Sequence, residues 1–150
     1  MQEFNRILFP VDLSESSTKI VPYVQAVAKK FESQIHILFA ARVFDHFTSM
    51  YVPHPSINKF EKELIEGAEK RLYEFVDENF GEFPHTKTAV VAGDPSEEII
   101  RYIRENKIDL VVMGTHGRKG MDKIIFGSVA ERVVKTAPVP VMVVNPYKAD

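Results

Sequence analysis

Apolar residues are arranged along the chain in two alternating patterns. The first is a short, nearly unbroken apolar run, which is typical of a β-strand covered on both faces of a parallel sheet. It predicts strands at residues 7–11, 35–41, 86–92, 108–113 and 139–144. The second is an apolar residue at every third or fourth position, which indicates the buried face of an α-helix. This spacing runs through residues 20–31, 60–80 and 99–103, and a fourth helix is expected over residues 127–137.

Strands that alternate with helices predict an α/β fold. Because crossovers between parallel strands are right-handed, the helices must cover both faces of the sheet. We therefore expect an open, doubly wound, mostly parallel five-stranded sheet of the Rossmann-like type. The chain has 150 residues and a mass of 17.1 kDa, which fits a single domain spanning residues 1–150.

The sequence predicts where the third helix starts. Asp94 is expected to be the N-cap of the third helix, Pro95 its first residue and Glu97 its third. The second helix is expected to end before Gly81.

Two connections follow the carboxyl ends of predicted strands, which is where doubly wound sheets bind ligands. Asp12 follows the first strand, and a glycine-rich loop that begins at Gly114 follows the fourth. Topology brings both to one crevice. Asp12 alone has a second interpretation, as a cap of the first helix.

The loop after the fourth strand favours a phosphate ligand. It contains three of the chain's seven glycines within residues 114–120 and leads to Gly127 and Ser128, where helical periodicity resumes. Unpaired N–H groups and the positive end of that helix form an anion site, to which the Ser128 hydroxyl adds a donor. Arg118, Lys119 and Lys123 add positive charge. The alternative is a structural loop in which Ser128 only caps the helix.

Composition removes several classes of function. The formal net charge is -2, so no overall basic field attracts nucleic acid or an anionic membrane. Cysteine is absent, which excludes disulfides, cysteine nucleophiles and cysteine-ligated metals. The first residues are polar, and no apolar run is long enough to span a membrane. A cytoplasmic protein is expected.

Common catalytic motifs are missing. The chain has no Gly-x4-Gly-Lys-Ser/Thr phosphate loop and no Gly-x-Gly-x2-Gly after the first strand. The five histidines show no metal-ligand spacing, and His36 is expected to be an ordinary strand residue. The serines at 14, 16 and 17 are explained most simply by capping of the first helix.

Three motifs together resemble the universal stress protein family over essentially the whole chain. They are Gly114-x2-Gly117-x9-Gly127-Ser128, the segment Ile-Leu-Phe-Pro-Val-Asp-Leu-Ser at residues 7–14, and Pro-Val-Pro-Val-Met-Val-Val at residues 138–144. The glycine spacing followed by Ser or Thr marks the ATP-binding branch of that family. The resemblance implies the strand order 3-2-1-4-5 and a homodimer formed through the last strand.

The resemblance also assigns residues to parts of ATP. Pro10, Val11 and either Ala40 or Ala41 are implied to border the adenine, and Asp12 to lie near the ribose or a phosphate-bound magnesium ion.

Residues of the second half of the chain are implied to hold the rest of the nucleotide. Met113 and Gly114 are implied to flank the nucleoside. The residues implied to hold the phosphates, largely through main-chain N–H groups, are Gly117, Arg118, Gly127, Ser128 and Val129.

The resulting interpretation is an ATP-binding regulator or sensor of the stress response. Two alternatives remain: a slow ATPase or nucleotidyl transferase that uses Asp12 with magnesium and Arg118, and an interaction module that binds no nucleotide. Residues 42–58 are unusually apolar for a connection and are expected to pack on the core or in a dimer, or else to form a lid or a docking surface.

Overall fold

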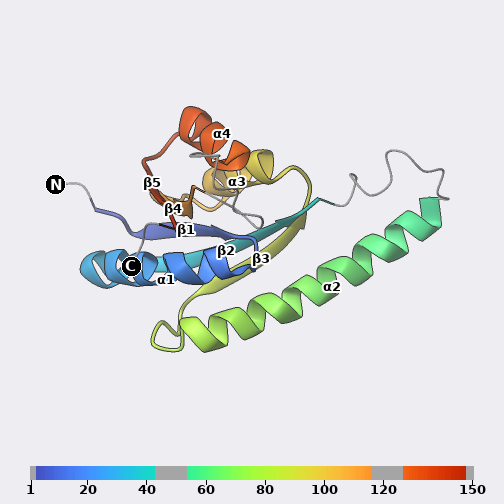
Figure 1. Cartoon of the computed structure of the whole chain (residues 1–150), viewed down its shortest axis with the longest axis horizontal. Helices are drawn as coiled ribbons and strands as arrows, with labels where there is room; N and C mark the ends of the chain where they lie inside the picture. The colour runs from blue at the N-terminus through green and yellow to red at the C-terminus, as the bar shows by residue number, and fades with distance from the viewer. Residues whose placement is uncertain (1–2, 43–53, 116–126, 148–150) are drawn as a thin grey trace.

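The computed structural model describes residues 3–42, 54–115 and 127–147. Strands and helices alternate along the chain, as the apolar pattern predicts (Figure 1). In chain order the elements are β1 Arg6–Val11, α1 Glu15–Phe31, β2 Gln34–Ala41, α2 His54–Asn79, β3 Lys87–Ala92, α3 Pro95–Glu105, β4 Leu110–Gly114, α4 Ser128–Thr136 and β5 Val141–Val144.

The five strands form one parallel sheet in the order β3-β2-β1-β4-β5. This confirms the doubly wound fold and the strand order. The first strand lies at the centre, where Ile7 is in register with Ile35 of β2 and Leu110 of β4. The chain first adds β2 and β3 on one side of β1, and then returns to add β4 and β5 on its other side. The strand order therefore reverses at β1.

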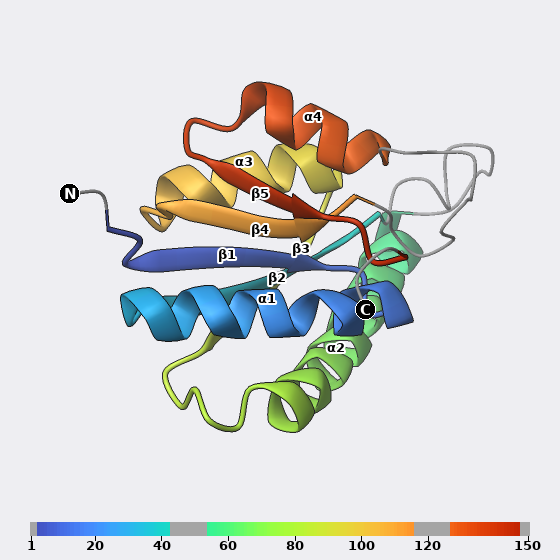
Figure 2. The ribbon, with the colours of Figure 1, turned by 60° about the vertical axis from the view of Figure 1, so that its left-hand side comes forward.

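Helices α1 and α2 cover one face of the sheet, and α3 and α4 cover the other (Figure 2). Side chains of β1 alternate between the two resulting cores. Ile7, Phe9 and Val11 belong to the core under α1 and α2, whereas Leu8 belongs to the core under α3 and α4. Burial on both faces is why β1 reads as an unbroken apolar run.

Three strands are shorter than the apolar runs predict, and each difference has a local cause. Thr86 directs its N–H and its hydroxyl to the carbonyl of Phe83, so it belongs to a turn and β3 starts one residue later. Ile108 donates its N–H to Ile103 O, which closes the end of α3, and β4 starts at Leu110. The fifth strand starts at Val141, directly after Pro140, because proline has no N–H to contribute to a ladder.

The second helix is longer than its spacing predicts. It begins at His54, so residues 54–58 are helical rather than part of a connection, and residues 43–53 lie outside the described part of the chain. Pro55 at the second position does not oppose this start, because a proline in the first turn removes an N–H that has no helical partner. The N-terminal end of α2 extends beyond the edge of the sheet (Figure 1).

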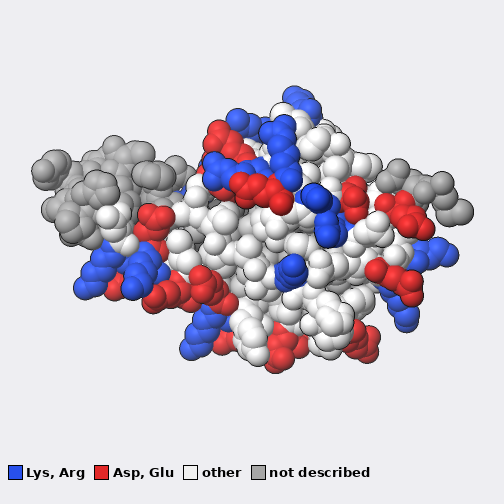
Figure 3. Space-filling model, turned by 180° about the vertical axis from the view of Figure 1, so that it is seen from behind, with Lys and Arg blue, Asp and Glu red and all other residues white. Residues whose placement is uncertain are grey.

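The surface carries both signs of charge. On the face opposite to that of Figure 1, basic and acidic side chains are interspersed, without a large patch of one sign (Figure 3). Among the described helices, none has the length and apolar character needed to span a bilayer.

Candidate functional site

A cavity of about 810 Å³ lies at the carboxyl ends of β1, β2 and β4. Its volume is within the range of small-molecule sites, and its position is where doubly wound sheets bind ligands. The cavity brings together ten residues singled out in the sequence: Pro10, Val11, Asp12, Ala40, Ala41, Met113, Gly114, Gly127, Ser128 and Val129. Gly117 and Arg118 lie outside the described residues.

Asp12 organises the turn between β1 and α1. Its Oδ1 accepts hydrogen bonds from Ser14 N at 3.0 Å, from Ser14 Oγ at 2.6 Å and from Ser17 Oγ at 2.9 Å. Its other oxygen, Oδ2, is buried and has no hydrogen-bond partner within the described chain. A buried carboxylate oxygen without a donor is costly, so this atom is available to a ligand or a cation.

The interpretation of Asp12 as the cap of the first helix is wrong. Ser14 is the N-cap of α1, and its side chain accepts from Ser16 N. Between them, Leu13 has a φ of 63°, a left-handed conformation that is unfavourable for a branched side chain. Asp12 holds the residues after Leu13, and Arg71 of α2 donates to Leu13 O at 3.4 Å. The turn is therefore fixed from two sides.

The N-terminus of α4 opens onto the same cavity. Gly127 is the N-cap and makes no side-chain cap hydrogen bond, so the alternative interpretation, in which Ser128 only caps this helix, is wrong. Ser128 is the first helical residue and is exposed, with no hydrogen bond from its hydroxyl within the described chain. The first N–H groups of a helix have no intrahelical acceptor. An anion in the cavity can accept from them and from the Ser128 hydroxyl.

One wall of the cavity was not expected from the sequence. It is formed by α2 residues spaced for one helical face, which are Glu63, Leu64, Gly67, Ala68 and Arg71. Gly67 lies well inside the helix, and a Cβ added there would meet no atom within 4 Å. A glycine inside a long amphipathic helix is the one signal in the sequence that points to this wall.

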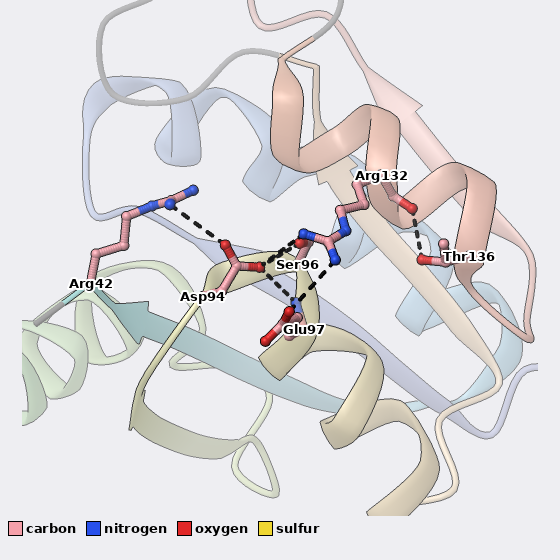
Figure 4. Close-up of polar contacts among 6 residues, drawn as sticks. All are labelled: Arg42, Asp94, Ser96, Glu97, Arg132 and Thr136. Atoms are coloured by element: carbon pink, nitrogen blue, oxygen red, sulfur yellow. Dashed lines mark hydrogen bonds and ion pairs between the residues drawn. The ribbon is translucent and has the colours of Figure 1, made fainter. Parts of the chain in front are cut away.

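Arg42 lies on the rim of the cavity directly after β2 and belongs to a charged network (Figure 4). Arg42 Nη1 is 3.6 Å from Asp94 Oδ1, and Arg132 Nη1 of α4 is 3.7 Å from Asp94 Oδ2. As predicted, Asp94 is the N-cap of α3, and its carboxylate accepts from Glu97 N at 3.1 Å and from Ser96 Oγ at 2.6 Å. The Ser96 hydroxyl contributes most to lowering the pKa of Asp94, followed by the Glu97 N–H and the two arginines.

The oxygen ligands at the cavity suit a magnesium ion that is shared with a bound phosphate, and do not form a metal site made of protein side chains alone. The described residues contain no group of three or more His, Asp or Glu side chains that could hold a metal ion. Magnesium is commonly held by one or two carboxylates together with phosphate oxygens of a substrate. Asp12 Oδ2 is one such oxygen, so the site fits magnesium only together with a phosphate ligand.

His36 lies away from this site, at the amino end of β2. It is buried, with Nδ1 2.7 Å from the hydroxyl of Tyr102 and Nε2 3.2 Å from Gln34 Oε1. Burial, and then the charges of Lys87 and Arg6, lower the pKa of His36. It is a core histidine, as the sequence predicts.

A parallel doubly wound sheet with a cavity at its carboxyl edge, bordered by a helix N-terminus, defines a Rossmann-like α/β domain. The family model described as the universal stress protein family matches residues 3–145. The chain belongs to this family, as its motifs predict.

Known relatives agree in sequence and in structure. Universal stress protein MJ0531 of Methanocaldococcus jannaschii is 33% identical over 153 aligned residues, which cover 98% of this chain and 85% of the relative. The solved structure of MJ0577, from the same organism, has a TM-score of 0.84 at 26% identity and covers 96% of this chain and 97% of that one. The universal stress protein of Archaeoglobus fulgidus in complex with dAMP shares the fold, with a TM-score of 0.65 at 18% identity and coverage of 95% and 98%.

Proposed function

We propose that this chain binds ATP in the cavity and acts as a nucleotide-dependent sensor or regulator of the stress response. The main support is that the N-terminus of α4 and Asp12 border the same cavity. The N-terminus of α4, with the exposed Ser128 hydroxyl, lines one volume large enough for a nucleotide together with Asp12 Oδ2, which has no hydrogen-bond partner among the described residues. A solved member of the family contains dAMP, which supports an adenine nucleotide as the class of ligand.

The phosphates of a nucleotide need hydrogen-bond donors and its adenine needs an apolar surface, and the cavity has both. Phosphates would accept from the first N–H groups of α4 at Ser128 and Val129, close to Gly127, whose own N–H donates to Thr115 O. Gly117 and Arg118 of the preceding loop would be further contacts. Adenine would pack against apolar residues. Those assigned to the base and nucleoside are Pro10, Val11, Ala40, Ala41, Met113 and Gly114, all of which line the cavity.

Magnesium would join the site through Asp12. Its Oδ2 is a hard oxygen ligand, and the ion would bring it together with phosphate oxygens of ATP. Asp12 would also stay fixed while doing so, because Oδ1 is held by three donors from Ser14 and Ser17.

The proposal includes a homodimer formed through β5. This strand is at the edge of the sheet, and its Met142 is 39% exposed. An uncovered apolar edge strand is an association surface.

The experiment is a calorimetric titration of the purified protein with ATP, ADP, AMP and adenosine, with and without magnesium. Binding of ATP with a 1:1 stoichiometry per chain, strengthened by magnesium in wild type but not in Asp12→Asn, is the expected result. The same preparation is denatured and its supernatant separated on an anion-exchange column to identify copurified nucleotide. An interaction module without a ligand would give neither binding heat nor nucleotide.

Phosphate release distinguishes a regulator from a slow ATPase. We expect release at the level of the buffer blank over the time of a binding experiment. Release that is proportional to protein and disappears in Gly127→Val would support the enzyme instead, because phosphoryl transfer needs the phosphates held at the N-terminus of α4.

A further inference from the structure

The rim of the cavity carries a cation that the site assignment leaves without a role. Arg42 follows the last residue of β2 and lines the cavity, and its side chain is 46% exposed. It is not one of the residues that the family resemblance assigns to the nucleotide. An ion pair joins Arg42 Nη1 to Asp94 Oδ1, on the α3 side of the cavity, at 3.6 Å (Figure 4).

Asp94 stabilises the start of α3 through contacts other than the ion pair with Arg42. It caps α3 through the N–H of Glu97, accepts from the Ser96 hydroxyl and faces a second cation, Arg132. The contact with Arg42 is longer than a direct hydrogen bond and joins two partly exposed side chains. Pairs of this kind contribute little to stability, because water screens them and the long side chain loses freedom. The Arg42 guanidinium can therefore leave Asp94 at small cost.

We propose that Arg42 contacts the bound nucleotide and selects for its phosphates, and that Asp94 competes with the ligand for the same guanidinium. The inference rests on the proposed function, since it assigns a residue of the same site. On binding, the guanidinium exchanges a carboxylate oxygen of Asp94 for a phosphate oxygen. A guanidinium matches the planar arrangement of two phosphate oxygens and forms strong charge-assisted hydrogen bonds with them.

The two residues then have opposite effects on affinity. Arg42 supplies attraction to the phosphates, so its loss weakens the binding of nucleotides. Asp94 holds the guanidinium in the ligand-free protein, so loss of the Asp94 charge strengthens binding. Neither change affects adenosine, which has no phosphate.

The test is a double-mutant cycle with Arg42→Gln and Asp94→Asn, titrated with ATP and with adenosine. Asparagine is as good an N-cap as aspartate, so α3 keeps its cap in Asp94→Asn. We expect Arg42→Gln to weaken ATP by about tenfold, as for loss of one charge-assisted hydrogen bond. Asp94→Asn should tighten ATP by about two- to fivefold, the equivalent of an exposed ion pair. The double variant should bind ATP like Arg42→Gln.

Arg104→Gln is the matched control for loss of one positive charge. Arg104 is on α3, lines no part of the cavity and has no ion pair within the described residues, so this variant should bind ATP like wild type. Melting curves of all variants identify any loss of folded protein.

Three results would overturn the inference. Wild-type affinity for ATP in Arg42→Gln would leave the proposed function intact and remove Arg42 from the site. Tighter ATP binding in the double variant than in Arg42→Gln would show that Asp94 acts through its long-range field rather than through Arg42. A wild-type protein that binds neither ATP nor adenosine would overturn the proposed function and, with it, this inference.

Discussion

Ser128 is the residue at which binding and helix stability can be separated most directly. Its exposed hydroxyl lies at the N-terminus of α4, beside the cavity. A hydrogen bond from this hydroxyl to phosphate would be charge-assisted and worth about 1.5–3 kcal/mol. Ser128→Ala should therefore weaken ATP by about tenfold or more, since about 1.4 kcal/mol is one decade. Adenosine should bind as it does to wild type, as measured by calorimetric titration of both ligands.

The melting temperature provides the control for Ser128→Ala. Because Gly127 is the N-cap and Ser128 makes no cap hydrogen bond, the substitution removes no cap. The melting temperature should stay close to that of wild type. Equal losses of affinity for ATP and adenosine would remove Ser128 from the phosphate site.

His36 predicts a pH dependence of stability. Its pKa in the folded protein lies below the ordinary value of 6.5, because burial and the neighbouring charges of Lys87 and Arg6 oppose protonation. The unfolded chain therefore binds the proton more readily. The contribution of neutral His36 to the free energy of unfolding is fully present above pH 6.5. It is lost as the pH falls from 6.5 through the lower pKa of the folded state.

We expect the free energy of unfolding to fall from pH 7 toward pH 5 less steeply in His36→Gln than in wild type. The difference should not exceed about 1.4 kcal/mol per pH unit, the limit for one proton. Urea unfolding at a series of pH values measures it. His85→Gln, at an exposed histidine, is the control and should keep the wild-type slope. Identical slopes in wild type and His36→Gln would contradict a lowered pKa of His36 in the folded protein.

At the scale of the element, α2 contains a glycine whose replacement should stabilise the protein. Gly67 is inside the helix, and an added Cβ would meet no atom within 4 Å. Glycine in a helix interior is less stable than alanine by roughly 0.5–1 kcal/mol. Gly67→Ala should raise the free energy of unfolding by that amount in a denaturant titration. A decrease would mean that the helix does not continue through this position.

Some elements could be predicted from the sequence and others could not, for physical reasons. The start of α3 is encoded within four residues from Asp94 to Glu97, because the cap, the first-turn proline and the third-position N–H are all local. The start of α2 at His54 is not, since prolines at 53 and 55 are equally compatible with a loop. The alternative in which Ser128 caps α4 could not be decided from the sequence, because Gly and Ser are both common at that position and the structure places Gly127 there.

At the scale of the whole molecule, the exposed edge of β5 predicts how two copies associate. Val143 packs against the core under α3 and α4, whereas Met142 is 39% exposed, so Met142→Lys tests the edge with less damage to the core. The added charge opposes pairing at an edge strand, and the variant should shift toward monomer in sedimentation velocity. A wild-type protein that is already monomeric at micromolar concentration would contradict the dimer.

Tyr73→Lys is the control for Met142→Lys. Tyr73 is 73% exposed on α2 and is equally changed from a large apolar side chain to a charged one. This variant should sediment like wild type.

The order of the strands could not be derived from apolar spacing, which contains no information on pairing. The family resemblance supplied it, and the structure confirms it. Topology alone was enough to bring Asp12 and Gly114 to one cavity, because the carboxyl ends of neighbouring parallel strands meet at one edge. The α2 wall needed the structure, since the angle at which a helix crosses a sheet is set by packing along its whole length.

The central position of β1 has a consequence for synthesis on the ribosome. Ile7 can pair with Ile35 once β2 has been synthesised, but its other neighbour, Leu110, is synthesised 75 residues after Ile35. Until then one edge of β1 is open, and nascent chains on neighbouring ribosomes can pair with it. The cavity also needs residues from both halves, so a nucleotide bound as we propose would bind only the finished chain. At a concentration 100 times its Kd it would add about 2.7 kcal/mol to the stability of that state and withdraw newly completed chains from aggregation.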